Sequence, residues 1–511
     1  MVKTIGLLGM SAYPIQVECD LATGLPRFDV IGLPDLAVKE SRDRVCAAVK
    51  NCGYEFPVGK ITMNLAPADV RKTGAGCDLA MLIALLSSTG QLKPVEESCA
   101  FIGELSLTGE IRPVNGVLPM VLSAMEEGIG TLFVPAGNAA EAAVIRGIRI
   151  YPVEHVKQLT GFLAGILELS PLEPAVPAHG APVLCPDFSE VKGQQSARRA
   201  LEIAAAGGHN ALLIGPPGSG KSMLAKRLPS ILPDMSFEES IETTKIYSIA
   251  GLLPKGEAMI TQRPFRAPHH TISPAGLSGG GAIPRPGEIS LAHNGVLFLD
   301  ELPEFSRAAM EILRQPIEDG RVTISRVNGT LTYPCSVMLI AAMNPCPCGY
   351  FGHPTRPCTC PPGKVSGYLG RVSGPLLDRL DLHIDAMPVE FESISSPQKS
   401  ESSAAIKQRV DKARAVQRER YQAIAPDEGI FCNARLSSAR LQQACPVSDD
   451  GMRLLKNAFD RLGLSARAYD RILKVARTIA DLDGQEVIGG AHIAEAVQYR
   501  SLDRKYWQNG K

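Results

Sequence analysis

A glycine-rich loop between an apolar run and a helical run constrains the fold of this chain more than any other feature. The apolar residues 211–214 precede the loop, and the helical pattern 223–228 follows it. In a GxxxxGK(S/T) loop the backbone N–H groups turn inward around phosphate oxygens, and the next helix adds the partial positive charge of its N-terminus. This order predicts an α/β fold that binds a nucleotide such as ATP, with the lysine at the β- and γ-phosphates and the serine on Mg²⁺. The loop consists of Gly215, Pro216, Pro217, Gly218, Ser219, Gly220, Lys221 and Ser222.

Two later apolar runs end in polar residues that suit the same site. The first ends at Asp300 and Glu301, where the aspartate would hold Mg²⁺ through water and the glutamate would polarise the attacking water. The second ends at Asn344, whose amide would position that water beside the γ-phosphate. Taken alone, the acid pair could begin a helix and the asparagine could be a turn residue. Their order after the phosphate loop favours the catalytic interpretation.

Alternating strand and helix patterns divide the 511 residues into three folded parts, which is the number that about 150 residues per domain suggests. Residues 1–165 form one predicted α/β domain, and residues 188–388 form a second that contains the phosphate loop. Residues 400–511 carry apolar side chains at helical spacing, which predicts a helical lid. The proline-rich segment 166–187 is the expected linker.

Composition excludes several classes of protein. Lys and Arg number 53, as do Asp and Glu, so any contact with nucleic acid must come from a local patch. No apolar run approaches 18 residues, so no membrane span is expected. The N-terminus has no basic cluster or cleavage site typical of a signal peptide. Thirteen cysteines, scattered except for one cluster, favour reduced thiols and a cytoplasmic location.

That cluster lies in a cysteine-rich loop at 345–362. It contains two CxC pairs, Cys346 with Cys348 and Cys358 with Cys360. In a reducing compartment four close thiols favour a structural Zn²⁺ site over disulfides. The CxC spacing is tighter than the usual CxxC of zinc knuckles, so free reduced thiols are the alternative interpretation.

Three strings identify a family. The chain reads RAPHHTIS at 266–273, PGEISLAHN at 286–294 and MNPCPCG at 343–349. With the phosphate loop and acid pair, these strings resemble the ComM/YifB competence family within the magnesium-chelatase-like AAA+ ATPases. The resemblance implies a hexameric ring ATPase that acts on DNA as a branch-migration helicase during homologous recombination in natural transformation. It also implies recombination proteins as partners.

Two arginines are candidates to stabilise the transition state. A guanidinium directed at the γ-phosphate offsets the charge that develops there, although most arginines lie on the surface or in ion pairs. The resemblance implies that Arg379 is an arginine finger acting on the ATP of the neighbouring subunit. It implies that Arg467 is a sensor 2 residue acting from the lid within its own subunit, with Arg471 as the nearest alternative.

The segment 320–333 alternates β-branched and polar residues around an Asn-Gly pair, which predicts a β-hairpin. In related ring ATPases a hairpin here projects into the central channel. Arg326, near the turn, would then contact a DNA phosphate. The alternative is an exposed hairpin with an incidental arginine.

The N-terminal part resembles the Lon-type protease fold in segments 72–81 and 107–118. That family cleaves with a Ser–Lys dyad, but Gly76 stands at the nucleophile position and no lysine occurs between Lys93 and Lys157. Without an amine partner, neither a hydroxyl nor the thiol of Cys77 would be activated. The domain is therefore predicted to be Lon-like and non-proteolytic. An ATP-dependent remodeller of a partner protein, or a chelatase-type motor subunit, is the alternative function.

Overall fold

A computed structural model describes residues 1–174, 185–254, 256–281, 284–326, 329–388, 400–500, 502, 506 and 507. Part of the expected linker, Asn328 and part of the end of the expected lid lie outside these ranges. The backbone of Arg326 is described, but its side chain is not.

The N-terminal part is built on a seven-stranded mixed sheet of order β3-β4-β2-β1-β5-β8-β9. Strands β1 and β2, and β2 and β4, pair antiparallel, and the other neighbours pair parallel. Helix α2 is buried almost throughout, as its uninterrupted apolar run predicts. The elements are β1 Val2–Leu8, β2 Ser11–Ala22, β3 Arg27–Ile31, α1 Leu36–Asn51, β4 Lys60–Ala66, α2 Asp78–Ser88, β5 Cys99–Phe101, β6 Glu104–Leu105, β7 Ile111–Arg112, α3 Val117–Glu126, β8 Thr131–Pro135, α4 Ala139–Ala142, β9 Arg149–Val153 and α5 Val156–Leu163.

The central part is built on a five-stranded parallel sheet of order β11-β14-β17-β10-β18. Its three middle strands are wholly buried, as expected for a parallel sheet covered by helices on both faces. The carboxyl ends of all these strands meet at one edge. The sheet and the first helices are α6 Gln195–Gly207, β10 Ala211–Ile214, α7 Lys221–Arg227, α8 Phe237–Ala250, β11 Phe265–Arg266, β14 Val296–Leu299, β17 Met338–Met343 and β18 Leu382–Asp385.

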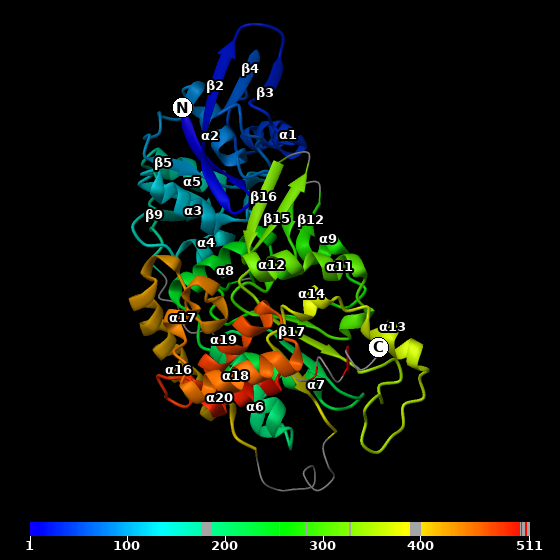
Figure 1. The fold of residues 1–511 in the computed structure, drawn as a ribbon. Helices are drawn as coiled ribbons and strands as arrows, with labels where there is room; N and C mark the ends of the chain where they lie inside the picture. Colours follow the sequence, from blue (N-terminus) through cyan, green and yellow to red (C-terminus); the bar gives the residue numbers. More distant parts are fainter. Residues whose placement is uncertain are drawn as a thin grey trace.

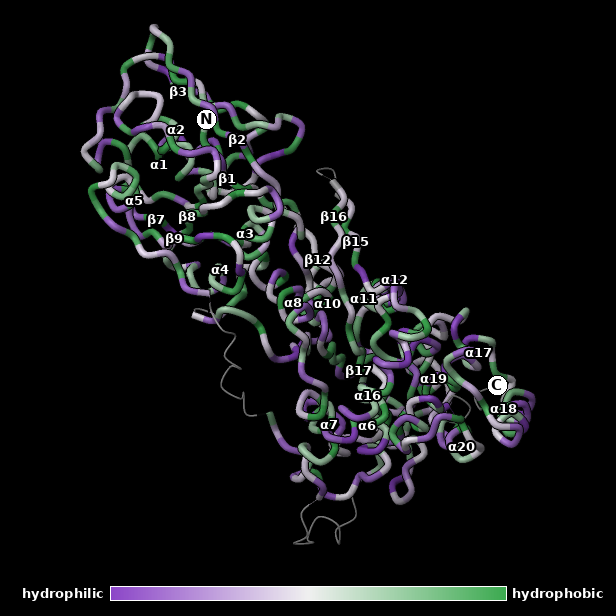
Figure 2. Tube along the Cα trace, turned by 90° about the vertical axis from the view of Figure 1, so that its left-hand side faces the viewer, coloured by the Kyte–Doolittle hydropathy of each residue, from purple (hydrophilic) through white to green (hydrophobic). Residues whose placement is uncertain are grey.

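Two insertions rise from this core. The first contains the short strands β12 Gly279–Gly280 and β13 Arg285–Pro286. The second is the predicted hairpin, which stands out beside β12 in both views (Figures 1 and 2). The hydroxyl of Tyr333 donates to the carbonyl of Pro284 at 2.9 Å and so joins the two insertions. The remaining elements of the core are α9 Pro274–Ser278, β12 Gly279–Gly280, β13 Arg285–Pro286, α10 Glu288–Leu291, α11 Arg307–Ile312, α12 Arg314–Asp319, β15 Arg321–Arg326, β16 Gly329–Pro334, α13 Pro362–Leu369 and α14 Gly374–Leu377.

The C-terminal part is helical, as predicted. Serines cap three of its helices, because Ser402, Ser448 and Ser465 each accept a backbone N–H of the first turn. Of the C-terminal helices, α16 and α19 pack against α6, and both views place the C-terminal helices on the far side of α6 from α7 (Figures 1 and 2). They are α16 Ser403–Ile424, α17 Leu441–Ala444, α18 Asp449–Leu462, α19 Ala466–Leu482 and α20 Gly490–Gln498.

The N-terminal part docks on the core through α3 and α8. The Ser248 hydroxyl donates to the Glu141 carboxylate at 2.6 Å, and the Ser248 carbonyl accepts the N–H of Gly116 at 3.1 Å. Apolar side chains of both parts share one cluster there, including Ile241 and Met259. In the part of the chain that the structure describes, no helix is long and apolar enough to cross a membrane.

Candidate nucleotide site

The phosphate loop joins β10 to α7 and passes through backbone positions that favour glycine. Gly218 and Gly220 have φ of 75° and 82°, in the left-handed region. A Cβ on Gly215 would lie 2.1 Å from the carbonyl oxygen of Ala386. The loop is therefore free to pass close to the neighbouring backbone and to present its N–H groups to a ligand.

Lys221 is the first residue of α7 and is buried. Its Nζ donates to the carbonyls of Gly215 and Pro216 at 2.8 and 2.9 Å, and to Oδ1 of Asn344 at 3.2 Å. Burial lowers the pKa of this lysine, and the charges of the acid pair oppose that shift. The ammonium thus lies within the loop, beside the residue that ends β17.

The magnesium ligands expected from the sequence lie together. The Oγ of Ser222 donates to Oδ2 of Asp300 at 2.6 Å, which joins the end of the phosphate loop to the end of β14. Mg²⁺ prefers hard oxygen ligands and keeps several waters, so a hydroxyl and a carboxylate at this edge fit the ion. Glu301 follows with φ of 53°, an uncommon conformation for a residue other than glycine, and its side chain is 57% exposed.

The parallel register explains why these residues meet. Ile214 pairs with Met343, and Leu299 pairs with Ala341, so β10, β14 and β17 end at the same edge. The structure accordingly brings Lys221, Ser222, Asp300, Glu301 and Asn344 to one place. The set can hold a triphosphate, its cation and an attacking water.

One residue at this edge was not anticipated. Nδ1 of His270 lies 3.3 Å from Oε2 of Glu301, and the His270 ring contacts the rings of His269 and Phe305. The chain reaches this position because β11 pairs with β14 and then continues past the same edge. A strand of only two paired residues gives a weak sequence signal, so the position of His270 beside Glu301 was not predicted. The RAPHHTIS string, which contains His270, indicated only the family.

His270 is expected to position Glu301, so His270→Ala should lower kcat about tenfold while KM for ATP changes little. The contact is made to the glutamate and not to the phosphate loop, so substrate binding should persist. Steady-state ATPase kinetics would measure the effect, with His269→Ala as the matched control and His270→Asn as a variant that can still hydrogen-bond Glu301. A matching rise in KM in His270→Ala would contradict this role.

Arg379 lies at the other edge of the sheet. Its carbonyl accepts the side-chain N–H of Asn210 at 3.2 Å, and Asn210 immediately precedes β10. Four residues of strand separate this edge from the phosphate loop by about 13 Å. Its guanidinium donates to the Pro375 carbonyl at 2.8 Å and pairs with Glu318. The structure therefore does not bring Arg379 to the phosphate loop of its own chain.

The expected action of Arg467 within its own subunit does not match its position. This exposed residue lies in the first turn of α19, and one turn later Arg471 pairs with the buried Asp381. The N–H of Asp381 donates to the Asn210 carbonyl at 2.8 Å, so α19 is anchored at the edge opposite the phosphate loop. Burial raises the pKa of Asp381, but Arg471 and His209 outweigh this and hold the pKa below its usual range. Arg471 is thus held in an ion pair.

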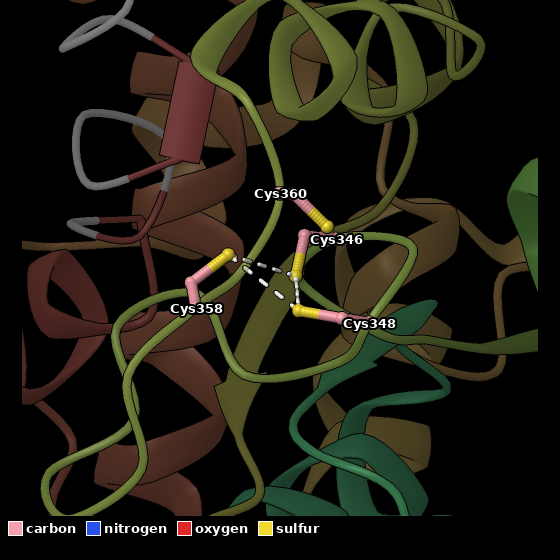
Figure 3. Close-up of side chains that lie close together, drawn as sticks. All are labelled: Cys346, Cys348, Cys358 and Cys360. Carbon is pink, nitrogen blue, oxygen red and sulfur yellow. Dashed lines mark hydrogen bonds between the residues drawn. The ribbon is translucent and has the colours of Figure 1, made fainter.

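The four cysteines of the loop after Asn344 converge, as Figure 3 shows. The Sγ atom of Cys346 lies 3.3 Å from that of Cys348 and 3.6 Å from that of Cys358, and the latter two are 3.5 Å apart. Together with Cys360, all four Sγ atoms lie within 4.8 Å of one another. Four thiols so placed can hold one metal ion.

The hairpin has two unlike faces. Val322, Ile324 and Tyr333 are buried on the core side. On the other face Thr323 and Thr332, and Ser325 and Thr330, form exposed cross-strand pairs. Arg326 pairs with Gly329 beside the turn, but its side chain lies outside the described residues, so its contact with DNA stays a prediction.

The Lon-like part contains an amine close to Cys77, outside the segment in which the Ser–Lys dyad places its lysine. Lys72 is buried, its Nζ donates to the carbonyl of Val70 at 2.8 Å, and its charge acts on Cys77. Burial nevertheless raises the pKa of Cys77 to about 12, with a further rise from Asp78. A thiol that stays protonated at neutral pH is a poor nucleophile.

The fold and the site define a P-loop ATPase of the AAA+ class, with a parallel sheet, a phosphate loop and acid pair at one edge, and a helical lid. Three family models match the chain in succession. They are subunit ChlI of Mg-chelatase over residues 17–138, magnesium chelatase subunit ChlI over 187–394, and the ChlI C-terminal model over 400–500.

The relatives narrow this class. The YifB protein of Salmonella typhimurium is 44% identical over 508 residues, covering 99% of this chain and 97% of that protein. The competence protein ComM of Haemophilus influenzae is 43% identical over 509 residues, covering 97% and 96%. The chain belongs to the ComM/YifB family of magnesium-chelatase-like ATPases. Lon protease 3 of Sorangium cellulosum is 26% identical over 167 residues, or 30% of this chain and 20% of that protein.

Proposed function

We propose that this protein is an ATP-hydrolysing ring motor that acts on DNA, as a branch-migration helicase in homologous recombination during natural transformation. The observation that carries the proposal is the division of the ATPase machinery between two edges of one sheet. The phosphate loop, the acid pair and Asn344 lie at one edge, and Arg379 lies at the other.

Within one subunit the described residues can bind ATP and prepare the attack. Arriving β- and γ-phosphate oxygens replace the loop carbonyls as acceptors for Lys221. Ser222 and Asp300 would hold Mg²⁺, which when bound neutralises charge on the transferring phosphoryl group. Glu301 accepts a hydrogen bond from the attacking water and polarises it, while Asn344 orients that water.

The remaining step needs a second copy of the chain. Arg379 is too far from its own phosphate loop, so its guanidinium can reach only the γ-phosphate bound by a neighbour. The position of α19 gives Arg467 the same side of the subunit, so we extend the proposal to action of Arg467 on a neighbour's nucleotide. In a closed ring, proposed to be a hexamer, every nucleotide site receives arginines from a neighbouring subunit.

DNA is the proposed substrate, and recombination proteins are the proposed partners in the cytoplasm. The name of the Haemophilus influenzae relative, a competence protein, supports a role in competence. The hairpin, which stands out from the core, supports contact with a polymer in a ring channel. ATPase assays without DNA and with single-stranded, duplex or branched DNA test the proposal. Turnover that no DNA stimulates would favour the protein-remodelling alternative.

Arg326→Ala is expected to reduce the DNA stimulation of ATPase several-fold and to leave the basal rate unchanged. Each lost phosphate contact weakens binding and should also flatten its dependence on salt. Arg321→Ala, at the base of the same hairpin, is the matched control. If the basal and stimulated rates fall together, Arg326 has a structural role instead.

The cofactor proposal has two parts. ATP with Mg²⁺ occupies the edge described above, and a structural Zn²⁺ occupies the four-cysteine cluster. We also propose that the Lon-like part is non-proteolytic, because Gly76 supplies no nucleophile and Cys77 stays protonated.

A further inference from the structure

We propose that the four-cysteine loop is a zinc-held support for the phosphate loop, so that the zinc content of the chain sets its affinity for nucleotide. This inference rests on the proposed ATP site and adds a metal-dependent element to it. The support is defined here as residues 345–361, which run from the end of β17 to the start of α13.

The sulfur atoms already have nearly the spacing of a tetrahedral zinc site. Zn–S bonds of about 2.3 Å place the four sulfurs of such a site about 3.8 Å apart. The three sulfur–sulfur distances among Cys346, Cys348 and Cys358 are 3.3, 3.6 and 3.5 Å. The N–H of Phe351 also donates to Sγ of Cys346 at 3.3 Å, the kind of hydrogen bond that orients a ligating sulfur.

The tip of the support touches the phosphate loop. Gly349 follows Cys348 and has φ of 85°, and a Cβ at this position would lie 2.3 Å from Cδ of Pro217. No side chain fits between them, so the backbone at Gly349 packs directly on the proline ring. The adjacent Pro216 carbonyl is one of the groups that hold Lys221.

The support also begins beside the residue that ends β17. Asn344, whose side chain accepts a hydrogen bond from Lys221 at 3.2 Å, is two residues before Cys346. Two of the groups that accept hydrogen bonds from Lys221 are therefore close to the support: Pro216 precedes the proline that Gly349 contacts, and Asn344 directly precedes the support. A shift in the support would displace both.

The segment has no regular secondary structure to hold it, although Cys346 and Phe351 pack in or against the core. Residues 344–361, all of which the structure describes, form no helix or strand. A backbone of this length without regular hydrogen bonds loses much conformational entropy when it is ordered. A metal bound by four thiolates supplies free energy that offsets this cost, as in small zinc domains.

The test begins with the zinc content and nucleotide affinity of the full chain. We expect one zinc per chain by elemental analysis. Removing it with a chelator, followed by gel filtration into Mg²⁺ buffer, should weaken the binding of a fluorescent ATP analogue about tenfold, and added Zn²⁺ should restore it. A zinc-free chain as purified, or unchanged affinity after zinc removal, would overturn the inference.

Variants separate the metal from its effect. Cys358→Ser and Cys360→Ser should lose zinc and nucleotide affinity together, and Cys185→Ser, outside the cluster, should lose neither. Gly349→Ala keeps all four thiols and should retain zinc, yet it should bind nucleotide more weakly because its Cβ displaces Pro217. Retained zinc with full nucleotide affinity in Gly349→Ala would refute the role of the contact between Gly349 and Pro217.

Lys221→Ala should lose nucleotide binding and keep zinc. A zinc-loaded wild-type chain that binds no nucleotide would refute the proposed function instead.

Discussion

Glu301→Gln is expected to bind ATP with wild-type affinity and to hydrolyse it at least about 100-fold more slowly. The amide has nearly the same shape as the carboxylate but lacks the negative charge that polarises the attacking water. Lys221, Ser222 and Asp300, which would bind the phosphates and Mg²⁺, are unchanged. Phosphate release under single-turnover conditions measures the chemistry, and a fluorescent ATP analogue measures binding.

The matched control for this variant is Glu304→Gln. Glu304 lies three residues further along the chain and pairs with Arg371 at 2.9 Å, away from the phosphate loop. It should retain normal hydrolysis. Normal turnover in Glu301→Gln would remove the role assigned to this residue and with it the proposed mechanism.

Arg379→Ala is expected to lower ATP hydrolysis about 1,000-fold without loss of ATP binding, the range that arginine fingers provide. The guanidinium is remote from the phosphate loop of its own chain, so binding should persist. The Glu318 carboxylate, which loses its partner, is 55% exposed and can be solvated in the variant. Arg453→Ala, an exposed arginine on α18, is the control and should hydrolyse ATP normally.

Mixing two inactive variants tests action between subunits. Lys221→Ala has no functional phosphate loop but keeps Arg379. Arg379→Ala lacks that arginine but keeps an intact phosphate loop. In mixed rings some sites combine an intact phosphate loop with an intact neighbouring arginine, so hydrolysis should partly recover. If the mixture stays as inactive as either variant alone, although mixed assembly is shown by crosslinking, Arg379 does not act on a neighbour.

Most of the ATP site was predictable because its signals are local. The phosphate loop specifies its own conformation through its glycines, and apolar strands followed by Asp300 and Asn344 end at one edge of any parallel sheet. The four cysteines were also predictable as a cluster, since two CxC pairs in a short loop are close in any compact fold. The α/β class and the helical C-terminal part followed from periodicity for the same reason.

Contacts between distant segments could not be predicted in this way. The position of α19 places Arg467 at the edge of the sheet opposite the phosphate loop. That position depends on the packing of α19 against α6 and on the ion pair between Arg471 and Asp381, which no local pattern specifies. His270 reaches Glu301 only because a strand of two residues pairs with β14. Lys72 acts on Cys77 from a position before it in the chain, whereas the lysine of a Ser–Lys dyad is expected after it.

The buried carboxylate of Asp381 has a mechanical consequence. Asp381 lies two residues after Arg379, and its carboxylate pairs with Arg471 of α19 and with His209, which lies just before β10. A tilt of the C-terminal helices would therefore shift the backbone that carries Arg379. In the proposed ring, the orientation of one subunit's C-terminal helices would determine how far its Arg379 guanidinium extends into the next subunit. ATP hydrolysis can then proceed from one subunit to the next around the ring.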